Sequence, residues 1–307
     1  MEEHAGHTPV LPKQVLELLQ PRVGQVMLDC TLGRGGHASL IAPLLGPTGR
    51  YIGLDVDPRN LAFARQRLSG MPCHLDLIQA NFSQARAVLD RLGVPTVDLL
   101  LADLGFSSNQ MDDPERGFSF SAAGPLDMRL DPTLPTTAAD LVNRLPEKEL
   151  ADLIYRYGEE HFSRRIARKI AQERQRSPIL TTVALADVVR RACGHRAAGQ
   201  RIDPATRTFM ALRIAVNGEL DALNHLLEDL PRLLAPHARA AIISFHSLED
   251  RRVKQSFQIL AQTGQAQKLT KKPLVADDQE ISANPRSRSA KLRSIRTEPG
   301  GTRSGIQ

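Results

Sequence analysis

Short apolar runs alternate with amphipathic stretches along residues 9–110. This alternation is typical of βαβ units, in which a helix returns the chain to a neighbouring parallel strand. The apolar runs have the length of buried strands, and the stretches between them have the spacing of helices with one apolar face. We expect strands at Val26–Asp29, Tyr51–Asp55, Leu75–Gln79 and Val97–Asp103, and helices at Leu40–Leu45, Asn60–Leu68 and Ser83–Leu92.

The pattern changes after Gln110. Residues 111–136 are rich in Asp, Gly, Pro and Ser, which predicts a long ordered loop. Residues 137–193 then show helical periodicity, with Ser177-Pro178 and Gly194 as breaks. The helices expected in this region are Ala138–Arg144, Glu147–Tyr157, Phe162–Arg176 and Thr182–Cys193.

The α/β pattern returns near residue 202. A long amphipathic helix over Pro204–Leu234, a strand at Ala240–Phe245, a helix at Leu248–Leu260 and a strand at Lys291–Thr297 are expected. Residues 262–290 lack periodicity and predict a loop, and the tail from Glu298 is expected to be disordered. The predicted fold class is therefore α/β. A Rossmann-like sheet domain formed by residues 1–110 and 202–307 is interrupted by an inserted, all-helical domain at 111–201.

Composition narrows the class of protein. Of the 307 residues, 41% are apolar, which is enough for a buried core. No apolar run approaches the ~20 residues that span a bilayer, and the acidic N-terminus lacks a signal-peptide pattern. Cys30, Cys73 and Cys193 have no zinc or disulfide spacing, and the nine histidines form no H-x-x-x-H pair. We therefore expect a cytoplasmic protein with no metal and no membrane partner.

Positive charge is concentrated in two regions. Residues 151–201 hold eleven Arg/Lys against five Asp/Glu, and residues 264–307 hold nine against four. The whole chain carries +6, so the rest of it carries −5. Two basic regions on a near-neutral to acidic body indicate a polyanionic partner, although solvated charged helices are the alternative interpretation. The sequence leaves the oligomeric state open, a homodimer included.

Residues 29–37, DCTLGRGGH, lie between the first expected strand and the first expected helix. Class I methyltransferases often hold S-adenosylmethionine with an acidic residue, a spacer and G-x-G-G at such a turn. Glycines let the backbone approach a flat cofactor and tolerate positive φ. Asp29 is suited to hold the ammonium group of that cofactor.

The same glycines also fit a dinucleotide site. Gly33, Gly35 and Ala38 match G-x-G-x-x-A, and Asp55 follows Gly33 by 22 positions, near the ~20 typical of a ribose-binding acid. A plain strand-to-helix turn is the third interpretation. Asp29 and the motif at residue 103 favour the methyltransferase.

Asp103 and Phe106 follow the fourth expected strand. Enzymes that methylate an exocyclic base amine often place Asp/Asn-Pro-Pro-Tyr/Phe here, but both prolines are missing. An acceptor bonded to the amine N–H would direct its lone pair toward the methyl group, and an aromatic ring would stack on the base. The alternative is that Asp103 touches only the cofactor and that Phe106 belongs to the core.

Two further positions end strands at the same sheet edge. Phe82 follows the third strand, where it would stack on the cofactor's adenine or pack in the core. His246 follows the strand at Ala240–Phe245, where it would contact substrate, accept a proton or cap the next helix.

Strings along nearly the whole chain resemble one family, the bacterial 16S rRNA cytosine-N4 methyltransferases, which modify a cytidine in the ribosomal decoding centre. The strings are HTPVL at 7–11, GRGGH at 33–37, DLGFSSNQ at 103–110, RGFSF at 116–120, GPLDMR at 124–129, YGEE at 157–160, PATRTF at 204–209, SFHSLEDR at 244–251 and NPRSRS at 284–289.

The resemblance implies a Rossmann-like class I methyltransferase domain with an inserted helical domain. It also implies that seven residues contact the cofactor: Gly35, Gly36, His37, Asp55, Phe82, Asp103 and Gln110. The glycine motif adds Gly33 to this set. Residue 106 is often aliphatic in the family, which weakens the stacking role of Phe106. A cofactor role for Asp103 puts its second role on the target amine in question.

The expected substrate is 16S rRNA in the small ribosomal subunit. The helical insert would bind its phosphates through Arg164, Arg165, Arg168 and Lys169. The 116–132 loop, with Phe118, Phe120 and Arg129, would close over the base. A methyltransferase for another RNA, a protein or a small molecule, a nicotinamide-dependent oxidoreductase and an inactive RNA-binding module remain as alternatives.

Overall fold

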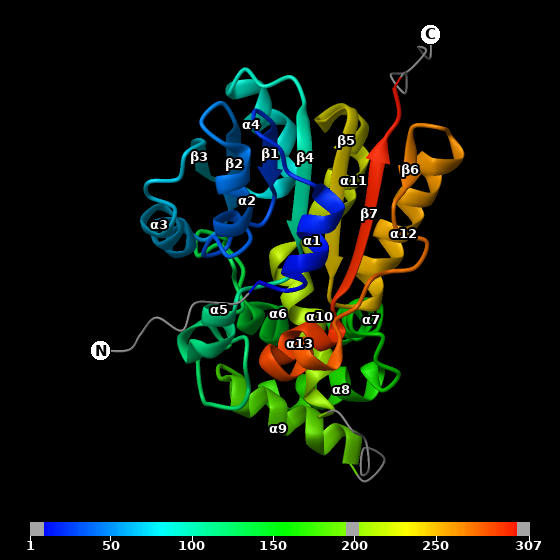
Figure 1. The fold of residues 1–307 in the computed structure, drawn as a ribbon. Helices are drawn as coiled ribbons and strands as arrows, with labels where there is room; N and C mark the ends of the chain where they lie inside the picture. Colours follow the sequence, from blue (N-terminus) through cyan, green and yellow to red (C-terminus); the bar gives the residue numbers. More distant parts are fainter. Residues whose placement is uncertain (1–8, 195–202, 300–307) are drawn as a thin grey trace. The chain divides into compact units, whose positions relative to one another are not determined.

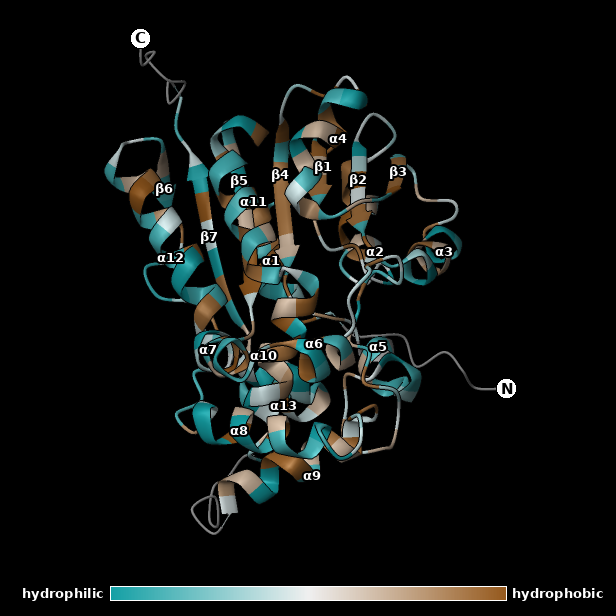
Figure 2. Cartoon of the chain, turned by 180° about the vertical axis from the view of Figure 1, so that it is seen from behind, coloured by the Kyte–Doolittle hydropathy of each residue, from teal (hydrophilic) through white to brown (hydrophobic). Residues whose placement is uncertain are grey.

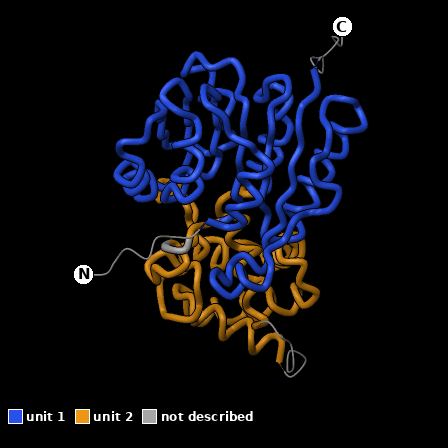
Figure 3. The backbone as a smooth tube through the Cα atoms, in the orientation of Figure 1, with its two compact units in different colours: residues 1–105, 220–307 blue, residues 106–219 orange. Residues whose placement is uncertain are grey.

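A computed structural model describes residues 9–194 and 203–299 (Figure 1). His7 and Thr8 of the first family string, the expected boundary near residue 202 and the tail beyond residue 299 lie outside the described residues. The chain forms two compact units, which are described separately. The first comprises residues 1–105 and 220–307, and the second comprises residues 106–219 (Figure 3).

The first unit is built on one seven-stranded sheet with the order β3-β2-β1-β4-β5-β7-β6. Strands β1 to β5 are parallel, and β7 runs antiparallel to both of its neighbours. This sheet confirms the expected α/β, Rossmann-like class. The strands are β1 Val26–Asp29, β2 Arg50–Asp55, β3 His74–Gln79, β4 Val97–Asp103, β5 Leu234–Ser244, β6 Ala266–Lys268 and β7 Lys291–Thr297.

Helices cover both faces of this sheet, and the central strands are more hydrophobic than the helices around them (Figure 2). Successive strand residues point to opposite faces, so Met27 and Leu28 of β1 belong to two different cores. The core around Met27 includes α1 Pro12–Leu19, α2 Ala38–Leu45 and α3 Pro58–Arg67. The core around Leu28 includes α4 Ala85–Arg91, α11 Glu219–Leu233 and α12 Ser247–Gln262.

The strand registers bring four predicted positions to one edge. Asp29 pairs with Gly53 of β2, Asp55 is opposite Gln79 of β3, and Asp103 is opposite Ile243 of β5. All of these residues lie at the carboxyl ends of parallel strands, which is where ligands bind in open α/β sheets. The sheet therefore brings Asp29, Asp55 and Asp103 to one edge, although they are up to 74 positions apart in sequence.

The second unit is helical and has its own core. A glycine allows two of its helices to cross closely: a Cβ on Gly158 of α7 would lie 2.7 Å from the carbonyl oxygen of Arg207 in α10. Its elements are α5 Ser108–Asp112, the 3-10 turn Pro114–Arg116, α6 Ala138–Arg144, α7 Glu147–Gly158, α8 Ser163–Arg174, α9 Thr182–Cys193 and α10 Ala205–Asn217.

The single helix expected over Pro204–Leu234 is wrong. Gly218 has φ 58°, in the left-handed region, and its N–H donates to the carbonyl of Ile214, which ends α10. Helix α11 then begins at Glu219. Asn217-Gly218 is a recognisable helix stop that the apolar periodicity on both sides concealed. As a result, α10 belongs to the second unit, which extends to Glu219, whereas the sheet domain was expected to resume near residue 202.

The loop expected at 262–290 contains ordered elements. Strand β6 pairs with β7, α13 Asp278–Ala283 starts at an Asp277 cap, and a 3-10 turn covers Pro285–Ser289. Helix α1 was likewise not expected. These pieces are too short to show a period, and tertiary contacts hold them: Glu280 Oε1 of α13 accepts the Leu11 N–H at 2.6 Å, just before α1. None of the helices that the structure describes combines the length and apolarity needed to cross a bilayer.

Candidate functional site

The glycine turn after β1 is held by Asp55 at the end of β2. Gly33 and Gly35 have φ values of 53° and 77°, which glycine adopts without strain. One carboxylate oxygen of Asp55 accepts the Gly33 N–H at 2.8 Å, and the other accepts the Asp57 N–H at 2.7 Å. Asn60 Nδ2 lies 3.3 Å from the same carboxylate. Asp55 therefore shapes the turn as well as ending the strand.

Burial raises the pKa of Asp55 to about 6, against the lowering effect of the hydrogen bonds from Asp57, Gly33 and Asn60. The ionised form is thus costly in the free protein. Any ligand that adds hydrogen-bond donors to this carboxylate would favour its charged state.

Asp29 lies in the core, only 1% exposed. Its oxygens accept the Tyr51 hydroxyl at 2.6 Å and the Thr31 N–H at 3.0 Å, and burial raises its pKa. These contacts make Asp29 a support of the turn, and the ammonium contact expected for it stays a prediction.

Asp103 lies beside this support. Its N–H donates to the Thr31 hydroxyl at 2.6 Å, and its Oδ2 lies 3.7 Å from His37 Nε2. Asp103 Oδ1 and His37 Nε2 are both buried and have no hydrogen-bond partner among the residues that the structure describes. Buried polar atoms are normally paired, so these two atoms at the glycine turn are positioned for a polar ligand.

Gly36, Phe82 and Arg34 complete this edge. The Gly36 carbonyl accepts the Ser39 hydroxyl at 2.8 Å, which fixes the end of the turn. Phe82 begins a 3-10 turn, is half-buried and packs against the core around Leu28, and its stacking on the adenine stays a prediction. The Arg34 guanidinium lies 4.7 Å from the Phe63 ring centre, a contact that the sequence analysis missed.

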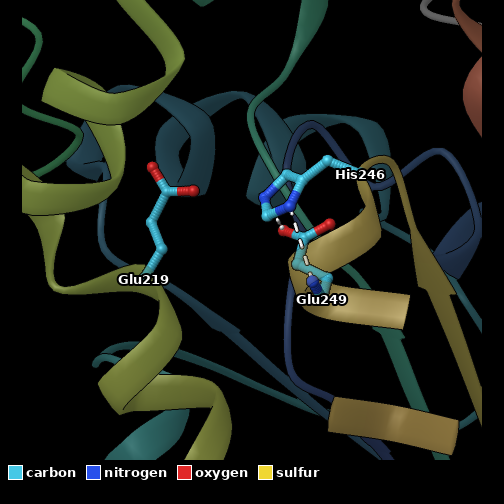
Figure 4. A group of neighbouring side chains, drawn as sticks. All are labelled: Glu219, His246 and Glu249. Carbon is cyan, nitrogen blue, oxygen red and sulfur yellow. Dashed lines mark hydrogen bonds and ion pairs between the residues drawn. The ribbon is translucent and has the colours of Figure 1, made fainter. Parts of the chain in front are cut away.

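His246 caps helix α12 (Figure 4). Its Nδ1 accepts the Glu249 N–H at 3.4 Å, and its Nε2 lies 3.2 Å from Glu249 Oε1. Glu249 reaches back to accept the Phe245 N–H at 2.8 Å. The capping interpretation of His246 therefore holds. Glu219, also drawn in Figure 4, belongs to the second unit, where it pairs with Arg213 at 2.7 Å.

Phe106 takes part in an aromatic cluster of the second unit. Its ring stacks on Phe118 with centroids 5.3 Å apart and an angle of 7°, and the Arg213 guanidinium lies 4.8 Å from its centre. Phe106 is thus already in contact with an aromatic ring and a cation, as a core residue would be.

Arg129 is engaged by its own loop. It forms a bidentate pair with Asp127, at 2.8 and 2.7 Å, and donates to the carbonyls of Pro132 and Leu134. Its guanidinium therefore stabilises the loop, and the substrate contact expected for it has little donor capacity left.

The remaining predicted residues also lie in the second unit. Gln110 is buried, and its side-chain oxygen accepts the Ser107 N–H at 3.0 Å. Arg164 and Arg165 are exposed on α8, and no salt bridge to them occurs among the described residues. Their neighbours on the helix differ, because Arg168 lies 3.6 Å from Glu147 and Lys169 lies 2.9 Å from Glu173.

The first-unit edge fits S-adenosylmethionine. It offers a turn with two positive-φ glycines, a carboxylate at Asp55 that lacks full compensation, and unpaired polar atoms on Asp103 and His37. These groups suit a ligand with a ribose and an ammonium group, which together supply hydroxyl and N–H donors.

Known proteins resolve what the glycine spacing left open. The MraW methylase family matches residues 4–298. A protein named ribosomal RNA small subunit methyltransferase H from Sorangium cellulosum is 52% identical over 96% of this chain and 91% of its own. Proteins of the same name from Geobacter sulfurreducens and Anaeromyxobacter dehalogenans are 48% and 47% identical, over 94% of this chain and 97% of theirs. This chain belongs to the MraW methylase family.

Proposed function

We propose that this protein is an S-adenosylmethionine-dependent methyltransferase that methylates the exocyclic N4 amine of a decoding-centre cytidine in 16S rRNA. The observation that carries the proposal is the buried Asp103 Oδ1, which has no hydrogen-bond partner among the described residues, beside the positive-φ glycine turn of a chain from a methylase family. The related proteins are named for methylation of small-subunit ribosomal RNA. Family membership favours S-adenosylmethionine over a nicotinamide dinucleotide at the glycines.

The cofactor would lie at the carboxyl edge of the sheet, where it supplies an electrophilic methyl group on sulfur. Asp55 would accept its ribose hydroxyls, and Phe82 would lie against its adenine. The turn glycines would let the backbone approach it closely. The full set proposed for cofactor binding is Gly33, Gly35, Gly36, His37, Asp55, Phe82, Asp103 and Gln110.

Asp103 is the candidate catalytic residue. A hydrogen bond from the cytosine N4–H to its carboxylate would direct the amine lone pair toward the methyl group, because that lone pair is otherwise delocalised into the ring. Orientation of this kind supplies a large part of the rate when the electrophile is already activated. The amine then releases its proton to water, with no dedicated base.

The protein would bind the RNA through its phosphates and recognise one base that is flipped out of its stack. A cytidine must leave its stack to reach the methyl group, which costs least in single-stranded or loop RNA. We place this reaction in the cytoplasm, with the small ribosomal subunit as partner.

The unpaired Arg164 and Arg165 are proposed to bind RNA phosphates. Replacing both with alanine should weaken rRNA binding several-fold and reduce the steepness of log affinity against log salt by about 1.4, at ~0.7 per phosphate contact in single strands. Binding titrations at several salt concentrations would measure this. The control is Arg144→Ala/Arg168→Ala, which removes the same charge from residues that already pair with Asp140 and Glu147. Equal slopes for both double variants would contradict the role of Arg164 and Arg165.

Cofactor binding should weaken as the pH falls below about 6. Burial raises the Asp55 pKa to about 6, so the carboxyl is protonated below that pH and loses acceptor capacity for ribose hydroxyls. The dissociation constant should rise up to about tenfold per pH unit once Asp55 protonates. Methylthioadenosine is a suitable probe between pH 5 and 8, because it lacks the amino-acid group. Asp55→Asn should bind weakly at every pH, and a flat wild-type profile would refute this role.

Methyl transfer tests the proposal as a whole. The protein would be incubated with labelled S-adenosylmethionine and small subunits from cells that lack the modification, with naked rRNA in parallel. The labelled nucleoside would then be identified by mass. N4-methylcytidine is the expected product. Label in another nucleoside, or on protein, would overturn the substrate assignment and favour the alternative methyltransferase.

A further inference from the structure

A cleft in the first unit, separate from the glycine turn, is lined by basic side chains. Lys254 comes from α12, Lys268 from the edge strand β6, Lys271 from the segment after it, and Arg293 from β7. Gln258 and Thr270 add polar groups, and no lining residue is acidic. Four elements of the chain thus bring positive charge to one place.

The three lysines carry uncompensated charge. Lys254, Lys268 and Lys271 are exposed, and none of them forms a salt bridge among the residues that the structure describes. Lys268 Nζ donates to the Gln258 side-chain oxygen, which holds one ammonium group at the cleft. Converging like charges repel, so an anion held between the three ammonium groups would stabilise their arrangement.

Arg293 is the fixed part of the cleft. It is 9% exposed and forms a bidentate pair with Asp250, at 2.7 and 3.2 Å. Burial alone would raise the pKa of Asp250, but Arg293 and Lys291 lower it below its ordinary value. Arg293 and Asp250 are therefore both ionised, and their opposite charges cancel. The net positive charge of the cleft comes from the three lysines.

The size and polarity of the cleft select a small anionic group. The cleft encloses about 40 Å³, which is room for a few water molecules or for the oxygens of one small group. The Thr270 hydroxyl accepts the Ser294 N–H at 3.1 Å and keeps its own hydrogen for an acceptor in the cleft. Flexible ammonium groups bind phosphate as point charges, without reading a base.

We propose that this lysine cleft binds a backbone phosphate of the RNA substrate, as a contact of the first unit distinct from Arg164 and Arg165. The inference rests on the proposed function, since it needs an RNA substrate. Lysines on an edge strand also discourage edge-to-edge sheet pairing, but that role would not require Lys254 on a helix to converge on them.

Salt-dependent RNA binding tests the cleft. Lys254→Gln/Lys268→Gln/Lys271→Gln should lower affinity for a 16S rRNA fragment that carries the target cytidine by about tenfold or more at ~100 mM salt. The slope of log affinity against log salt should fall by about 2, at ~0.7 per lost contact. The control, Lys13→Gln/Arg91→Gln/Arg232→Gln, removes the same charge from exposed positions that do not line the cleft. Cofactor binding should be unchanged in both triple variants.

Protection of the lysines gives an independent readout on the unmodified protein. Acetylation of surface amines, followed by mass spectrometry, should show that RNA shields Lys254, Lys268 and Lys271 but not Lys13. Equal losses in both triple variants, or no shielding, would overturn the lysine cleft while wild-type methyl transfer to rRNA continued. Absence of RNA binding and methyl transfer by the wild type would instead overturn the proposed function itself.

Discussion

Asp103→Asn is expected to reduce methyl transfer to rRNA by about 10²–10³, the loss typical when one preorganised polar group of an active site is removed. The amide has nearly the shape of the carboxylate, so Thr31 should still receive the Asp103 N–H. The substitution changes the group at the position of the unpaired Oδ1. Either the neutral amide oxygen or the amide NH₂ group, a donor, takes that position. A donor facing the cytosine amine cannot accept its hydrogen.

Separate measurements of binding and turnover locate the loss. An unchanged cofactor dissociation constant with a reduced kcat would support the action of Asp103 on the amine, whereas a raised dissociation constant would make it a cofactor ligand. Asp98→Asn is the matched control: Asp98 lies near the other end of β4 and accepts the Val26 N–H at 2.8 Å. Near wild-type methyl transfer by Asp103→Asn would remove it from the catalytic site.

Gly35→Val is expected to raise the cofactor dissociation constant by about 100-fold, or about 2.7 kcal/mol. Gly35 has φ 77°, where a β-branched residue is strongly disfavoured. An added Cβ would also lie 3.3 Å from Leu68 Cδ1, so the Leu68 side chain or the turn must give way, and the larger valine side chain adds to this crowding. A shift of the turn would disturb the neighbouring Gly33 N–H, which Asp55 binds.

Gly70→Val separates this local effect from backbone strain. Gly70 has φ 82°, and nothing lies within 4 Å of an added Cβ. Both variants should lower the melting temperature by a similar amount, at a cost of order 1–3 kcal/mol. Only Gly35→Val should lose cofactor affinity, measured by calorimetric titration. Equal affinities in the two variants would show that the turn does not hold the cofactor.

The local pattern of apolar and polar residues predicts strands β1 and β4 well but not the helix break at Gly218. Strands β1 and β4 begin and end at the predicted residues, because a strand buried on both faces is a continuous apolar run. The break at Gly218 was missed because apolar periodicity continues on both sides of it. A helix stop depends on one residue's φ, which outweighs the periodicity around it.

The roles of individual side chains were also predicted only in part from local sequence. The sequence identified Asp55, Asp103 and the glycines as a set, but it did not show that Asp29 and Arg129 already form hydrogen bonds to neighbouring groups. Whether a carboxylate or guanidinium remains available depends on the groups that folding places beside it. No residue spacing reveals that Tyr51 and Thr31 occupy Asp29.

The sequence by itself determined the α/β class, the positions of the first four strands along the chain, the glycine turn and the family strings. All of these are local patterns of polarity and residue type, and they can be recognised without knowing which distant residues each one contacts. Only the tertiary structure decided that α10 belongs to the helical unit and that Asp103 keeps an unpaired oxygen. It alone brought Lys254 and Lys271 to one cleft. These features depend on strand pairing and burial between distant residues, and the free energy of a polar group is set by those neighbours.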